Sequence, residues 1–170
     1  MPNWAEGSLK VRGKEKDIVA FLRGALGGIP SFGASIKAAL GGGEIEVPGV
    51  TIEEDDFNMV ISSPNGLHIE GSRRAFIEGS VDYWFLDEDD EEEPAQVVFT
   101  IDNFKQAWAV QSDNFARLSE KYNIDIKIHA FERGMQFNQL IEIHKGEIIH
   151  DQEIQFDDYE WECVMPNLGG

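Results

Sequence analysis

Hydrophobic and polar residues alternate in some stretches of this chain and recur every three or four positions in others. Alternation from Ser8 to Arg12 predicts a short first strand. From Lys16 to Leu26 the apolar residues fall at helical spacing, and Gly27-Gly28 follows as a stop signal. The chain is therefore predicted to open with a strand and an amphipathic helix.

The middle of the chain is predicted to consist mostly of strands. Repeated glycines and Pro30 make 27–43 a flexible connection, with a brief helix possible at 35–40. Pro64-Asn65-Gly66 predicts a hairpin turn, because Asn-Gly readily adopts positive φ. The strands expected here are Glu44–Val47, Asn58–Ser62, Leu67–Gly71 and Ala75–Phe85.

In the last third of the chain, stretches with strand periodicity and stretches with helix periodicity follow one another. A strand is expected from Val97 to Ile101, a helix from Ser112 to Asn123, and a half-buried strand from Ile124 to Ala130. A hairpin follows, with arms at 137–143 and 147–156 and its turn at Lys145-Gly146.

This order of elements predicts an α+β fold, with two helices on one face of a mainly antiparallel sheet and an extra C-terminal hairpin. A ferredoxin-like topology fits that order best. We expect a single domain over 1–170, with the glycine-rich connection at 27–43 and an acidic loop at 87–94.

The net charge of the chain indicates which class of partner it binds. The chain has 32 acidic and 14 basic residues, a net charge of −18, and most of the excess lies after Ser80. Such a surface repels nucleic acid and anionic membrane, and it attracts a positively charged protein. The expected partner is therefore a basic protein, with no direct nucleic acid or membrane binding.

Three acidic clusters are the candidate partner-binding residues. The run at 87–93 suits a phosphate-mimicking arm, and it equally suits a solvated loop that keeps the protein soluble. The candidates are Glu53, Glu54, Asp55 and Asp56, then Asp87, Glu88, Asp89, Asp90, Glu91, Glu92 and Glu93, then Asp157, Asp158, Glu160 and Glu162.

The number of cysteines and the length of the apolar runs indicate in which cellular compartment the protein is found. Cys163 is the only cysteine, which favours a reducing cytosol. No apolar run approaches the roughly twenty residues that span a bilayer, and the first residues lack a signal-peptide pattern. We expect a cytoplasmic protein.

The sequence contains no clear motif for catalysis or for metal binding. The acidic run lacks the spacing and turn glycine of a Ca²⁺ loop, and the four histidines are scattered. Carboxylates near Cys163 oppose thiolate formation, so that residue is interpreted as an inert strand residue. We expect no cofactor, no metal and no catalytic residues.

Two further features have two interpretations each. Arg73-Arg74 either binds a phosphate or an acidic partner, or balances nearby Glu70 and Glu78, which is the favoured interpretation. The tryptophans at 84, 108 and 161 are either interface anchors or, as strand position favours, core residues.

Two stretches carry a family resemblance. The opening MPNWAEGSLKVRG at 1–13, and 118–137 with its helix, strand and Gly-Met turn, resemble the YubB-like ferredoxin-fold family of phage and plasmid proteins. The family usually has cysteine where Ala5 stands and asparagine where Gly7 stands. The resemblance implies a ferredoxin-like fold and a mobile-element origin, and it transfers no activity.

The favoured hypothesis is a non-enzymatic mobile-element protein that inhibits a host nucleic-acid-binding defence protein. It would act as an anti-CRISPR or anti-restriction DNA mimic that occupies a basic groove. An accessory interaction module whose acidity serves only solubility is the alternative, and a metal-dependent or hydrolytic enzyme is the third class.

Overall fold

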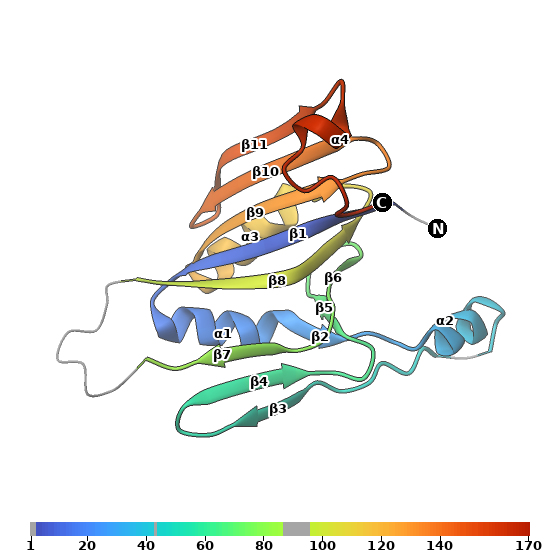
Figure 1. Ribbon diagram of the computed structural model, residues 1–170. Helices are drawn as coiled ribbons and strands as arrows, with labels where there is room; N and C mark the ends of the chain where they lie inside the picture. Colours follow the sequence, from blue (N-terminus) through green and yellow to red (C-terminus); the bar gives the residue numbers. More distant parts are fainter. Residues whose placement is uncertain (1–2, 43, 87–95) are drawn as a thin grey trace.

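The computed structural model describes residues 3–42, 44–86 and 96–170 (Figure 1). It is an α+β protein whose strands pair almost entirely antiparallel, as the sequence predicted. Along the chain the elements are β1 (Trp4–Gly13), α1 (Glu15–Ala25), β2 (Leu26–Gly28), α2 (Phe32–Ala39), β3 (Thr51–Glu54), β4 (Asn58–Ser62), β5 (Leu67–Ile69), β6 (Ala75–Ile77), β7 (Val81–Trp84), β8 (Val97–Ala107), α3 (Ser112–Tyr122), β9 (Asp125–Glu132), β10 (Phe137–His144), β11 (Glu147–Gln155) and α4 (Tyr159–Glu162).

Strand β1 lies inside the larger sheet, whose order is β11-β10-β9-β1-β8-β6-β5-β2. It pairs antiparallel with β8 on one side and with β9 on the other. Ala5, Leu9 and Val11 are fully buried while Lys10 is exposed, so alternation places one face of β1 in the core. The strand is longer than predicted because a bulge between Gly7 and Leu9 lets pairing with β8 continue past the predicted start.

Helices α1 and α3 contact one another and supply much of the core. α1 also contacts β1 and β2, and α3 contacts β9, β10 and β11. Phe21 and Leu22 of α1 and Phe115 and Leu118 of α3 are buried at helical spacing. The rings of Phe21 and Tyr122 meet edge to face at 5.7 Å, which joins the two helices directly.

A smaller sheet of order β3-β4-β7 shares the same core. Met59, Ile61, Val81 and Tyr83 are buried in that core, whereas β3 is exposed along its whole length. Burial, reinforced by the nearby carboxylate of Glu15, raises the pKa of Tyr83. The smaller sheet is therefore packed on one side and open along β3.

Three expectations for the middle of the chain are wrong. Residues 44–47 form no strand, because Ile45 and Val47 are exposed and have no strand beside them. Gly66 has φ +88°, as a turn requires, but β4 and β5 on either side belong to different sheets and form no hairpin. The strand expected at 75–85 is divided at Gly79, with φ +82°, into β6 and β7.

The glycine-rich segment 27–43 contains more regular structure than expected. Its first two residues complete β2, which pairs antiparallel with β5. The predicted brief helix lies earlier, as α2, and the side-chain oxygen of Ser31 accepts a hydrogen bond from the backbone N–H of Ala34 at its start. The acidic loop expected at 87–94 lies outside the described residues.

Gly7 tests how tightly β1 is held. A Cβ atom at Gly7 would overlap the backbone carbonyl oxygen of His129 on β9, whereas one at Gly33 in α2 would meet nothing. We expect Gly7→Ala to lower the free energy of unfolding by about 1–3 kcal/mol, because neither backbone can yield without breaking the ladder. Urea denaturation measures this, with Gly33→Ala as the matched control, which should be neutral or stabilising by about 1 kcal/mol. Equal midpoints for the two variants would contradict the packing described.

Candidate functional site

The first acidic cluster lies at the open edge of the smaller sheet. Glu53 and Glu54 end β3, and the Glu54 carboxylate is paired with Arg23. The Asp55 carboxylate accepts hydrogen bonds from the backbone N–H groups of Asn58 at 2.9 Å and Phe57 at 2.7 Å, and these bonds lower the pKa of Asp55. Part of this cluster therefore shapes the turn into β4 and is already engaged, while Asp56 is exposed.

The second cluster, 87–93, lies outside the described residues, so only its flanks can be placed. The backbone N–H of Phe85 donates to the carbonyl of Phe57 at 2.8 Å. The next N–H, that of Leu86, donates to Glu15 Oε1 at 2.8 Å. The chain therefore enters the run beside the turn that follows the first cluster.

The third cluster surrounds the short helix α4. Asp157 and Asp158 precede it, and Glu160 and Glu162 lie on it, all four exposed. The chain turns into a helix after Asp158, whose side chain accepts a hydrogen bond from the backbone N–H of Trp161 at 3.3 Å.

A small second core holds α4 on the larger sheet. Tyr159 and Cys163 are buried against Phe131. The Tyr159 hydroxyl and the Cys163 thiol both lie within hydrogen-bonding distance of Asn138 Oδ1, at 3.3 and 3.5 Å. Cys163 is thus a packed residue after a helical turn and not a strand residue. Burial raises the pKa of Tyr159.

Strand β11 extends the third cluster along the border of the larger sheet. It is an edge strand of this sheet, and every residue in it is exposed except Ile154, which is half-buried. From Gly146 to Gly170 the sequence contains no lysine or arginine. We call the carboxylates of β11, of α4 and of the turn between them the acidic edge: Glu147, Asp151, Glu153, Asp157, Asp158, Glu160 and Glu162.

The candidate residues do not form one surface. Figure 1 places β11 and α4 at the upper end of the molecule and β3 at the lower end. The structure thus separates 157–162 from 53–56. It adds Glu147, Asp151 and Glu153, which the sequence-based selection missed, and the absence of lysine and arginine after Lys145 was the signal that could have identified them.

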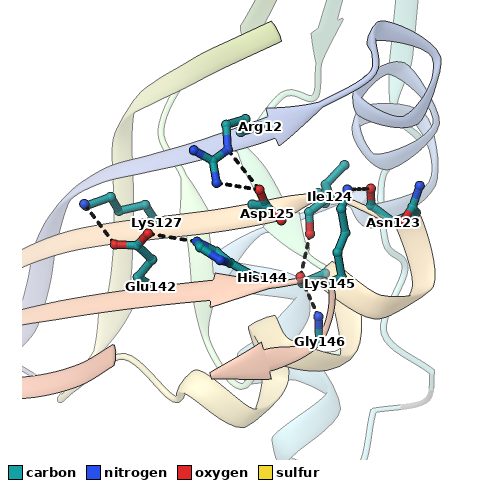
Figure 2. A network of polar contacts seen from close by, with 10 residues as sticks. Arg12, Asn123, Ile124, Asp125, Lys127, Glu142, His144, Lys145 and Gly146 are labelled. Atoms are coloured by element: carbon teal, nitrogen blue, oxygen red, sulfur yellow. Dashed lines mark hydrogen bonds and ion pairs between the residues drawn. The ribbon is translucent and has the colours of Figure 1, made fainter. Parts of the chain in front are cut away.

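Two other carboxylates on the larger sheet, those of Asp125 and Glu142, are paired with cations (Figure 2). Arg12 donates to Asp125 Oδ2 from Nε at 2.9 Å and Nη2 at 2.7 Å, across the pairing of β1 with β9. Lys127 donates to Glu142 Oε2 at 3.1 Å, and His144 Nε2 lies 2.8 Å from Glu142 Oε1. These residues line a cavity of about 190 Å³. Their charges largely cancel, in contrast to the acidic edge, which takes part in no salt bridge between described residues.

Three tryptophans are exposed, so the core position favoured for them is wrong. Trp84, Trp108 and Trp161 are 66%, 59% and 86% exposed. Trp84 falls on the outward parity of β7, and Trp161 lies on α4 beside buried Tyr159 but points away from the second core. Trp108 follows the end of β8 with φ +73°, which redirects its side chain. Large exposed rings of this kind are typical of binding surfaces.

Within 3–42, 44–86 and 96–170, no group of three or more His, Cys, Asp or Glu side chains is arranged to hold a metal ion. Among the helices of those ranges, none is long and apolar enough to cross a membrane.

The Glu142 network gives a prediction for solution. The hydrogen bond from Lys127, followed by that from His144, lowers the pKa of Glu142 from its usual 4.5. Lys127→Met should raise that pKa toward the usual value, as measured by NMR titration, because it removes the largest cause. The stability that Glu142 contributes is present above the usual pKa and is lost as the pH falls through the lowered one, so the stability difference between variant and wild type should shrink on acidification.

Lys10→Met is the control, since Lys10 lines the same cavity without bonding Glu142. It should leave the pKa of Glu142 unchanged. An unaltered Glu142 titration in Lys127→Met would show that the pair does not form in solution.

Comparison with known proteins adds no relative. No family model matches this chain, and neither a curated protein nor a solved structure matches it.

Proposed function

We propose that this chain is a non-catalytic protein of a phage or other mobile element that inhibits a nucleic-acid-binding defence protein of a bacterial host, in the cytoplasm of that host. The target class is a CRISPR effector or a restriction enzyme, and the mechanism is occupation of its basic groove as a DNA mimic. The observation that carries the proposal is the acidic edge, an exposed border of carboxylates with no lysine or arginine between Gly146 and Gly170.

The spacing of the acidic edge suits a groove built for phosphates. Asp151 and Glu153 lie two residues apart on β11, so their Cα atoms are about 6.6 Å apart on one face. One strand of DNA rises about 3.4 Å per phosphate, so two residues of β11 correspond to two nucleotides. Lysine and arginine side chains that accept phosphates can therefore meet these carboxylates in similar register, and long-range attraction would accelerate the encounter.

We also propose that the fold is ferredoxin-like and that the chain belongs to the YubB-like family. Support comes from the order β9-β1-β8-β6, in which neighbours are antiparallel, α1 follows β1 and α3 follows β8. In this proposal α1 and α3 cover one face, and the hairpin of β10 and β11 extends the sheet. Gly7 departs from the family pattern where the backbone of His129 leaves no room for a side chain.

The alternative is an accessory module that binds a protein through its aromatics, with acidity serving solubility. The exposure of Trp84, Trp108 and Trp161 favours it. The two functions differ in which substitutions abolish binding and in how binding responds to salt.

A competition experiment tests the DNA-mimic proposal. A purified host CRISPR effector or restriction enzyme binds fluorescent DNA, and this protein is titrated in at about 50 and 200 mM salt. The variant Glu153→Gln, Glu160→Gln, Glu162→Gln should displace DNA at least about tenfold less well than wild type, a difference of about 1.4 kcal/mol. The wild-type effect should also weaken at the higher salt.

The matched control neutralises three exposed acids elsewhere: Glu44→Gln, Glu46→Gln, Asp102→Asn. It has the same net charge as the edge variant and should compete like wild type. Equal loss in both variants would mean that only total charge matters. Retained competition by the edge variant, with loss in Trp84→Ala or Trp161→Ala, would favour the aromatic module.

A further inference from the structure

A second surface has the opposite character to the acidic edge. A cavity of about 360 Å³ lies where the turn before β6 meets the segment between β8 and α3. This volume is in the range of small-molecule sites. Its lining residues are Arg73, Arg74, Ala107, Trp108, Ala109 and Gln111, and we call it the Arg-Trp pocket.

The lining concentrates positive charge in a strongly negative protein. Two arginines and no acidic residue line the pocket, although the chain has 32 acidic residues. The guanidinium of Arg74 also lies over the ring of Trp4, 5.7 Å from its centroid. The neighbours expected to balance these arginines are paired elsewhere, since Glu70 bonds Lys121 and Glu78 bonds Lys105. The salt bridges between described residues include neither Arg73 nor Arg74, so the balancing interpretation is wrong for the described part of the chain.

Buried hydrogen bonds hold the two walls of the pocket together. Gln106 is fully buried, its Nε2 donates to the carbonyl of Arg73 at 3.0 Å, and its Oε1 accepts from the N–H of Gln111 at 3.2 Å. The N–H of Ala107 also donates to the carbonyl of Arg74 at 3.1 Å. One buried amide therefore connects the arginine wall to the wall that carries Trp108.

The backbone on both walls is held in an unusual conformation. Arg74 has φ +56° and Trp108 has φ +73°, a left-handed region that bulky residues rarely adopt. The N–H of Trp108 is fixed by the carbonyl of Asn3 at 2.8 Å. Strain of this kind persists only where surrounding contacts enforce it, and it gathers at binding and catalytic sites.

We propose that the Arg-Trp pocket binds a small phosphorylated molecule with a planar ring, of the mononucleotide class. Guanidinium groups bind phosphate oxygens in a bidentate manner, and the exposed indole of Trp108 offers a face for a base to stack on. Gln111 adds an amide that can donate and accept hydrogen bonds. The net charge of −18 repels a ligand in proportion to the ligand's own charge, which favours a mononucleotide over a nucleic acid strand.

The experiment is a titration of the full-length protein with adenosine monophosphate, followed by NMR and calorimetry. In the wild type we expect saturable one-to-one binding, with shifts at the Trp108 indole N–H and at Arg73 and Arg74. Arg73→Gln should weaken binding at least about tenfold, while Arg117→Gln, outside the pocket, should not. Trp108→Asn tests the stacking wall, because Asn tolerates positive φ.

Binding of related ligands tests whether both the phosphate and the ring are recognised. Inorganic phosphate and uncharged adenosine should each bind at least about tenfold more weakly than the monophosphate, because each lacks one of the two contacts. Phosphate binding as tightly as the monophosphate, or a single-stranded oligonucleotide binding more tightly, would overturn the assignment. So would wild-type shifts that are absent or that map away from Arg73, Arg74 and Trp108.

Discussion

The paired ladders of β1 determine where the other surfaces of this protein lie. β8 on one side leads toward β6 and the Arg-Trp pocket, and β9 on the other leads through β10 to β11 and the acidic edge. The approach of β1 to β9 is so close that Gly7 faces a backbone carbonyl. A one-residue slip in either pairing of β1 would turn its side chains to the opposite face relative to the partner strand.

The acidic residues of this protein differ in their pairing according to where they lie on the larger sheet. Two acids on inner strands of the sheet, Asp125 and Glu142, are neutralised by arginine, lysine or histidine neighbours (Figure 2). Along β11 and α4 no acid forms a salt bridge with another described residue. The cost of that unpaired charge is small in water but grows against another anion, so the acidic edge favours cationic partners. The Arg-Trp pocket is the local exception, and it has room only for a small ligand.

The spacing of hydrophobic residues predicted those helices and strands that keep a single period along their length and end at a recognisable turn residue. Asn123 ends α3 with φ +55°, and Lys145-Gly146 turns the hairpin with φ +48° and +93°, as expected. The division at Gly79 was not predictable, because buried Ile77 and Val81 keep the same parity on both sides of it.

The sites were harder to predict than the elements. The run at 157–162 alternates like a strand, but the Asp158 cap and the packing of Tyr159 and Cys163 on Phe131 favour a helical turn. The Arg-Trp pocket joins residues more than thirty positions apart through buried Gln106, a contact that no local pattern contains. Charge counting identified acidity but not its distribution, because distribution depends on which strand lies at the border of the sheet.

Hydrogen–deuterium exchange on the complex with a host effector is the most direct test that the acidic edge is the binding surface. Backbone amides of 147–162 should exchange more slowly in the complex than in the free protein, while β3 and β7 should change little. Protection confined to the region of Trp84 or Trp108, with 147–162 exchanging as in the free protein, would contradict binding through the acidic edge.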